Sequence, residues 1–117
     1  MQKKILIIVI TWNKEAFVLN LLSQIKEKIK YKNYEILVVD NCSEDSTVEK
    51  IQKLFPEVSL IVNEENLGGT GGFNTGLAFA MRNSNKYEYI WLLDNDVELI
   101  DDPLSPAIGI LEKHKDI

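Results

Sequence analysis

The sequence predicts an α/β domain built on a mostly parallel sheet flanked by helices. Short runs of β-branched and aliphatic residues alternate along the chain with segments whose apolar residues recur at helical spacing. The strongest of these runs is apolar at every position, which is typical of a strand that helices bury on both faces. Strand and helix alternation of this kind favours parallel strands joined by right-handed crossovers.

The first half of the chain predicts two strands and two helices. Residues 5–10 form the first strand, and the helical spacing of apolar residues over 14–31 predicts an amphipathic helix. Residues 36–39 predict the second strand. The turn and capping residues 40–46 then start a second helix, which Pro56 ends.

The second half continues the alternation. Residues 58–62 predict a third strand, and residues 63–72 predict a polar loop rich in glycine. A helix follows this loop and leads to a fourth strand over 89–93. Residues 97–100 are expected to continue extended, and residues 106–114 predict a last helix.

Length and composition fit one such domain. The chain has 117 residues, of which 45% are hydrophobic and 26% are charged. A domain of this size buries roughly two thirds of the surface that its unfolded chain exposes, so residues 1–117 are expected to form one domain with one core. The charged segment before Ile117 brings no closing core element, and we expect a truncated domain, the N-terminal part of a longer protein.

Charge and cysteine content exclude some classes of partner. Lys and Arg number 13 against 18 Asp and Glu, which gives a net charge of −5 and argues against nucleic acid as a partner. Cys42 is the only cysteine, so no internal disulfide forms and a cytoplasmic location is expected. The apolar run at residues 5–10 is too short for a signal peptide or a membrane span, so membrane association at the cytoplasmic face would be peripheral or come from segments outside this sequence.

Polar clusters follow three of the predicted strands. They are Thr11-Trp12-Asn13, Asp40-Asn41 and Asp94-Asn95-Asp96. In an open α/β sheet the ligand crevice lies beyond the carboxyl ends of the strands. We therefore expect the binding site where these clusters meet.

The two aspartates after the fourth strand suggest a cation site. Residues i and i+2 of an extended segment point the same way, so Asp94 and Asp96 could both face one ion. Carboxylate oxygens suit Mg²⁺ or Mn²⁺, and a diphosphate ligand would complete the coordination. The alternative is a plain turn with capping acids.

Glycines are concentrated between the third and fourth strands. Five of the six lie within residues 68–76. Glycine permits positive φ and close approach of the main chain to a ligand or to another element, and successive N–H groups can cradle an anion. A flexible surface loop is the alternative. The P-loop and dinucleotide patterns both fail, because no Gly-Lys-Ser/Thr occurs and Asn74 stands where the third glycine is needed.

Three further residues are candidates for function. Asp40 and Trp12 each have a binding and a structural interpretation, and Cys42 has no functional one. Asp40 could accept hydrogen bonds from a nucleobase or a ribose, or could cap the helix that follows. Trp12 could wall a base or simply pack. Cys42 has no histidine near it in the sequence, so cysteine nucleophile chemistry is not expected.

Taken together, these motifs resemble the N-terminal, nucleotide-binding half of family 2 glycosyltransferases with the GT-A fold. Residues 7–13 (IIVITWN) are similar to the family's opening strand and turn, and residues 37–43 (LVVDNCS) to its second strand with the donor-base aspartate. Residues 91–96 (WLLDND) are similar to its metal-binding DxD motif. Residues 66–76 look most like the galactofuranosyl- and rhamnosyltransferase branches.

The resemblance implies a role for each matching residue. Thr11, Trp12 and Asp40 would line the nucleoside pocket, and Asn66 and Gly69 would lie against it.

At the DxD motif, Asp94 would contact the donor near the ribose and diphosphate, and Asp96 would be the main ligand of Mn²⁺ or Mg²⁺. Asn95 would also border the donor. It departs mildly from the family, since many relatives carry another acid there.

The function implied by the resemblance is sugar transfer in polysaccharide biosynthesis. A nucleotide sugar, carrying UDP or dTDP, would donate to a hydroxyl of a glycan or lipid-linked acceptor, with inversion at the sugar. The family places its catalytic base in the C-terminal half, after Ile117, so no catalytic residue is named here. Whether the chain alone is active stays open.

Three alternatives are weighed against this hypothesis. A receiver-like phosphoacceptor domain would need a carboxylate pair where Thr11 and Trp12 stand, and a late Lys-Pro. A nucleotidyltransferase would need a glycine-rich loop after the first strand. A nucleotide-binding module without catalysis fits the same motifs, and only the longer protein could separate it from a transferase.

Overall fold

The computed structural model describes residues 4–99 and 101–113 as four strands that alternate with four helices. The order is β1 (Ile5–Thr11), α1 (Glu15–Lys28), β2 (Tyr34–Asp40), α2 (Thr47–Leu54), β3 (Ser59–Val62), α3 (Gly68–Arg82), β4 (Tyr89–Asp94) and α4 (Leu104–Lys113). All strands are parallel, in the order β3-β2-β1-β4. The predicted fold class is confirmed.

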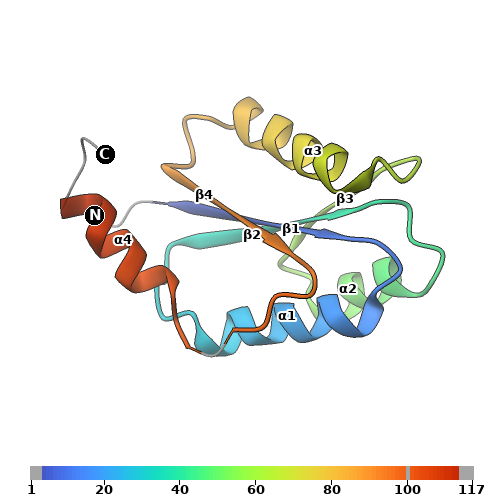
Figure 1. The fold of residues 1–117 in the computed structure, drawn as a ribbon, viewed down its shortest axis with the longest axis horizontal. Coiled ribbons are helices and arrows are strands. Elements are labelled where there is room, and N and C mark those ends of the chain that lie inside the picture. Colours follow the sequence, from blue (N-terminus) through green and yellow to red (C-terminus); the bar gives the residue numbers. More distant parts are fainter. Residues whose placement is uncertain (1–3, 100, 114–117) are drawn as a thin grey trace.

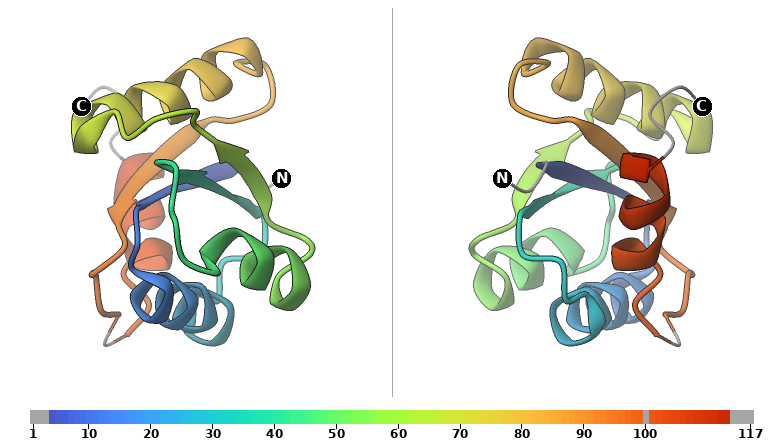
Figure 2. Two further views of the ribbon diagram at one scale, coloured as in Figure 1. Left: turned by 90° about the vertical axis from the view of Figure 1, so that its right-hand side faces the viewer. Right: turned by 90° about the vertical axis from the view of Figure 1, so that its left-hand side faces the viewer.

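Helices cover both faces of the sheet. α3 lies along one face, and α1, α2 and α4 lie on the other, as Figure 1 and the two end-on views of Figure 2 show. With β1 between β2 and β4, the carboxyl ends of three strands come together at one edge of the sheet.

β1 is buried on both faces because its side chains alternate between two apolar clusters. Ile5, Ile7 and Val9 belong to the cluster shared with α1, α2 and α4. Leu6, Ile8 and Ile10 belong to the smaller cluster under α3. This explains the unbroken apolar run, since neither face of the strand meets water.

Glycines let α3 lie directly on the sheet. A Cβ at Gly76 would lie 2.6 Å from Cγ2 of Ile8, and a Cβ at Gly72 would lie 2.7 Å from Cγ2 of Ile10. Both glycines are buried within the helix. These two glycines therefore allow the main chain to approach β1, and not a ligand.

The predicted loop over residues 63–72 is wrong in its second half, because α3 begins at Gly68. Glycine lowers the intrinsic stability of a helix by about 1 kcal/mol relative to alanine, and this suggested a loop. Packing of the helix on β1 and β2 offsets that cost.

Smaller differences concern the ends of elements. Residues 97–99 are not a strand; the Val97 N–H donates to the Asp94 carbonyl at 3.3 Å, so β4 closes in a turn. α1 ends at Lys28, because Ile29 is already extended and its buried side chain leads the chain toward β2. α4 starts at Leu104, two residues before the predicted start, while Ile100 and His114 lie outside the described residues.

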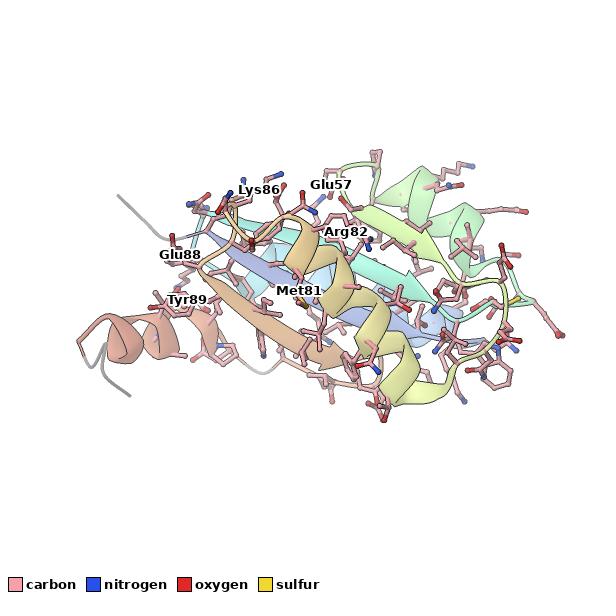
Figure 3. All side chains as sticks on the ribbon, turned by 90° about the horizontal axis from the view of Figure 1, so that it is seen from above. Glu57, Met81, Arg82, Lys86, Glu88 and Tyr89 are labelled. Carbon is pink, nitrogen blue, oxygen red and sulfur yellow. The ribbon has the colours of Figure 1, made fainter. Side chains whose placement is uncertain are left out.

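The opposite edge of the sheet carries the amino ends of the strands. The chain returns there after α3, and Lys86, Glu88 and Tyr89 lie beside the start of β4 (Figure 3). The Glu88 N–H donates to the Lys4 carbonyl at 2.8 Å. Among the described residues, no helix is long and apolar enough to cross a membrane.

Candidate functional site

The polar clusters after β1, β2 and β4 lie at one level of the sheet. Thr11 pairs with Asp40 in the ladder between β1 and β2, and Ile10 pairs with Asp94 between β1 and β4. The Asn41 N–H donates to the Thr11 carbonyl at 2.9 Å, which extends the ladder by one step. The three clusters therefore share one edge, as the sequence predicts.

A hollow of about 300 Å³ opens at this edge. Its lining comes from the ends of β1, β2 and β4 and from the start of α3: Ile10, Thr11, Trp12, Lys14, Asn41, Asn66, Gly68, Gly69, Asp94 and Asn95. Six of the seven residues predicted to bind a nucleotide sugar are in this set, and Asp40 is not.

Asp40 is fully buried and engaged within the fold. Its Oδ2 accepts the backbone N–H of Ser43 at 2.7 Å, and its Oδ1 accepts the Ser43 hydroxyl at 2.6 Å. Neither bond reaches α2, which begins at Thr47, so Asp40 closes the loop after β2 and does not cap the helix that follows. Its contact with a nucleoside stays a prediction.

The turn after β1 is pinned to the loop after β2. The Asn13 N–H donates to Oγ of Ser43 at 2.9 Å, and Oδ1 of Asn13 accepts the Glu44 N–H at 2.7 Å. Asn13 has a positive φ of 47°, a conformation that asparagine tolerates better than most residues. The turn holds Trp12 at the rim of the hollow, with 44% of its surface exposed.

The turn after β4 is tied to β1 through a side-chain bond. Nδ2 of Asn95 donates to Oγ1 of Thr11 at 3.0 Å. Asp94 uses Oδ1 to accept the Asn95 N–H at 2.8 Å. The middle residue of this motif therefore fixes the turn against the neighbouring strand.

Asp94 and Asp96 do not share one face of a strand. β4 ends at Asp94, and Asn95 and Asp96 form a turn, so the expected i, i+2 alignment is wrong. Both carboxylates are exposed, but only Asp94 lines the hollow.

The donor set still fits a hard divalent cation. Among the described residues no group of three or more His, Cys, Asp or Glu side chains is placed to hold a metal. Mg²⁺ commonly binds through one or two carboxylates and completes its coordination with water and substrate phosphates. The Asp94 carboxylate in the lining of the hollow, with exposed Asp96 two residues further along the turn, matches that pattern.

The start of α3 forms the opposite wall. Gly68 has a φ of +74°, and its N–H donates to Oδ1 of Asn66 at 2.8 Å. A Cβ at Gly69 would meet no atom within 4 Å, so the space beside that residue is open. Gly68 and Gly69, in the first turn of a 15-residue helix, thus line the hollow, and the N–H groups of a first helical turn have no partner within the helix.

Four lining residues have no predicted role in donor binding: Ile10, Lys14, Asn41 and Gly68. Lys14 brings a cation to the hollow, and its position just after the first strand was the available signal. Asn41 is 2% exposed and forms hydrogen bonds with the end of β1 and with the start of α3. Asn41 belongs to the predicted cluster after the second strand, but its hydrogen bonds join residues far apart in the sequence and could not be predicted from a local pattern.

A second hollow of about 420 Å³ lies at the amino ends of β2 and β3. Lys26 and Glu57, both part of its lining, form an ion pair at 2.6 Å. It is larger than the hollow at the carboxyl ends, yet none of the strand-end clusters reaches it. Volume alone therefore does not favour it as the functional site.

Comparison with known proteins decides the family. Residues 6–117 match the family model for glycosyl transferase family 2. The chain belongs to this family. The match covers nearly the whole chain and every strand-end cluster described above.

Among family members, the chain is similar to the poly(ribitol-phosphate) β-N-acetylglucosaminyltransferase TarS of Staphylococcus aureus (strain Mu50). The two are 30% identical over 115 residues, which cover 95% of this chain and 19% of TarS. The crystal structure of S. aureus TarS 1–349 in complex with UDP matches 96% of this chain and 33% of that chain, with a TM-score of 0.79 and 28% identity.

A mannosyltransferase, PcManGT from Pyrobaculum calidifontis, in complex with GDP-Man and Mn²⁺, is a further structural neighbour. Its TM-score is 0.66 at 26% identity, over 82% of this chain and 28% of that one. The family 2 chain described here thus spans about a fifth to a third of these proteins. The narrower resemblance to galactofuranosyl- and rhamnosyltransferases stays a prediction.

Proposed function

We propose that this family 2 chain forms the donor site of a glycosyltransferase, binding a nucleotide sugar at the carboxyl ends of β1, β2 and β4. The observation that carries the proposal is the convergence of Thr11, Trp12, Asn66, Gly69, Asp94 and Asn95 on one hollow. Structural neighbours with UDP and with GDP-Man support a nucleoside diphosphate as the ligand class.

Each wall of the hollow suits one part of such a donor. The exposed ring of Trp12 offers a flat apolar surface for the nucleobase. Lys14 and the N-terminal N–H groups of α3 offer positive potential for the diphosphate.

Asp94 and Asp96 would hold Mg²⁺ or Mn²⁺. A diphosphate brought beside two carboxylates repels them, and a divalent cation between them removes that repulsion. When bound, the cation neutralises the charge that grows on the departing nucleoside diphosphate. Lys14, which also lines the hollow, would supply a second positive charge.

Transfer would then be completed by groups beyond this sequence. A base deprotonates the acceptor hydroxyl, which attacks the sugar carbon as the nucleoside diphosphate departs, and this single displacement inverts the configuration. A glycan or lipid-linked hydroxyl as acceptor, a location at the cytoplasmic face of the membrane and UDP or dTDP as the carrier belong to this proposal. The observed strand order also favours it over a phosphoacceptor domain, since receiver folds place β3 beside β1.

Thermal unfolding with UDP, dTDP and GDP, each with and without Mn²⁺, tests the proposal. A ligand at 100 times its Kd stabilises a fold by about 2.7 kcal/mol, which raises the Tm of a domain of this size by several degrees. We expect a rise with one nucleotide that requires Mn²⁺ and is lost in Asp96→Ala.

The matched control is Glu98→Ala, which removes the same charge from an exposed residue that does not line the hollow. It should keep the full rise in Tm. A rise without Mn²⁺ would remove the metal from the proposal, and no rise with any nucleotide would contradict the donor site itself.

A further inference from the structure

Asn41 is a buried polar residue that joins the segments around the hollow. Its Nδ2 donates to the Gly68 carbonyl at 2.9 Å, and its Oδ1 accepts Nδ2 of Asn63 at 2.9 Å and the Leu67 N–H at 3.4 Å. Its own backbone N–H donates to the Thr11 carbonyl. One side chain at the end of β2 thus binds the start of α3 and the segment that leads to it.

The packing around this amide leaves it little freedom. A Cβ at Gly72 would lie 2.9 Å from Nδ2 of Asn41, so the missing side chain of Gly72 makes the room that the amide occupies. Asn63 is held in turn by Oγ1 of Thr75 at 3.3 Å, and Thr75 lies one turn further along α3. The network therefore joins two turns of the helix to the strand end.

The start of α3 has few other attachments. Leu67 precedes the helix without a side-chain capping bond, and Gly68 and Gly69 are both exposed. The bond from the Gly68 N–H to Asn66 stays within the same loop. Of the interactions described here, those of Asn41 are the ones that hold Gly68 to the sheet.

We propose that Asn41 is the positioning residue of the nucleotide pocket. Its amide sets the distance between the wall formed by Gly68 and Gly69 and the wall formed by Thr11 and Trp12. The inference rests on the proposed function, because it assigns Asn41 a part in the affinity of that same site. Asn41 also lines the hollow, but the role proposed for it is exerted through its bond to Gly68.

Two substitutions separate this role from general stability. Asn41→Ala removes all three side-chain bonds. Asn41→Asp keeps the size and an acceptor for Asn63 and Leu67, but it sets a carboxylate oxygen in place of Nδ2, opposite the Gly68 carbonyl. Both should raise the Kd for the nucleotide that the wild-type chain binds with Mn²⁺, by about tenfold or more, as loss of a positioning partner commonly does.

The measurement is calorimetric titration with UDP, dTDP and GDP in Mn²⁺, well below the unfolding temperature of each variant. Asp102→Ala is the stability-matched control, since it weakens an anchor of α4 at the other edge of the sheet. Distant sites are nearly independent, so its Kd should stay within about twofold of wild type. Amide hydrogen exchange in the free chain should be faster at Leu67 in Asn41→Ala, which loses the acceptor of that N–H, and unchanged in the control.

Asn63→Ala keeps the test decisive if the Asn41 variants do not fold. It removes one bond to Oδ1 of Asn41 and should raise the Kd by a smaller factor in the same direction. Wild-type affinity in every folded variant of Asn41 and Asn63 would overturn the positioning role alone. Absence of nucleotide binding by the wild-type chain would overturn the proposed function, and this inference with it.

Discussion

At the scale of single residues, Gly72 and Gly76 allow the closest contact between α3 and the sheet. They are four residues apart, so they lie on the same face of the helix at successive turns. Each leaves space that a side chain of β1 fills, Ile10 beside Gly72 and Ile8 beside Gly76. The position of α3, and with it one wall of the hollow, depends on these two missing side chains.

Gly76→Ala should therefore destabilise the chain. Alanine favours the helix by about 1 kcal/mol, but overpacking against a buried residue commonly costs 1–3 kcal/mol. The added Cβ would lie 2.6 Å from Cγ2 of Ile8. We expect a net loss of up to about 2 kcal/mol in the free energy of unfolding, measured by urea denaturation.

Gly69→Ala is the matched control in the same helix, because its Cβ would meet no atom within 4 Å. Its stability should equal or slightly exceed that of the wild-type chain. A Gly76→Ala variant as stable as Gly69→Ala would show that α3 does not rest on β1 as described.

At the scale of elements, one carboxylate joins the start of α4 to the segment that follows α1. Oδ1 of Asp102 accepts the N–H groups of Leu104 and Ser105 at 3.1 and 3.2 Å, and its Oδ2 accepts the Lys30 N–H at 3.0 Å. Burial by itself would raise the pKa of Asp102, but the hydrogen bonds from Ser105, Lys30 and Leu104 outweigh it and lower the pKa.

This lowered pKa predicts a pH dependence that Asp102→Ala removes. A carboxyl whose pKa is lower in the folded state stabilises the fold above its unfolded pKa, about 3.9, and that contribution is lost as the pH falls through the folded value. The free energy of unfolding should be about 1 kcal/mol higher for wild type than for Asp102→Ala at pH 7, which is the usual contribution of a helix cap.

Urea denaturation of both proteins from pH 7 to pH 2.5 checks this. Other carboxyls titrate equally in the two chains, so the difference between them isolates Asp102. The difference in free energy of unfolding between wild type and Asp102→Ala should become smaller below about pH 4. A constant difference across the whole range would mean that the charge on Asp102 contributes nothing to holding α4.

At the scale of the whole molecule, the strand order creates the site. β1 is central, so its carboxyl end lies between those of β2 and β4, and three polar clusters far apart in the sequence become neighbours. Apolar periodicity predicts the strands and helices, and the rule that crevices form at strand ends predicts where the clusters meet. These parts of the fold and site could be predicted because they depend on local patterns.

The remainder depends on contacts between distant segments. α3 begins inside a glycine-rich stretch because the sheet lies beneath it, and neither Gly72 nor Gly76 reveals that partner in the sequence. Asn41 interacts with residues 22 to 30 positions away, so its place in the network could not be read from its neighbours. The turn at Asn95 likewise depends on Thr11, 84 residues earlier.

The most direct measurement of the central claim is a nuclear magnetic resonance titration of the ¹⁵N-labelled chain with UDP, dTDP or GDP in Mg²⁺. Shift changes should concentrate at Thr11, Trp12, Lys14, Asn41, Asn66, Gly68, Gly69, Asp94 and Asn95, the lining of the hollow at the carboxyl ends. Changes centred on Lys26, Tyr34 and Glu57, around the hollow at the amino ends, would contradict the account, as would a well-folded spectrum that none of the three nucleotides alters.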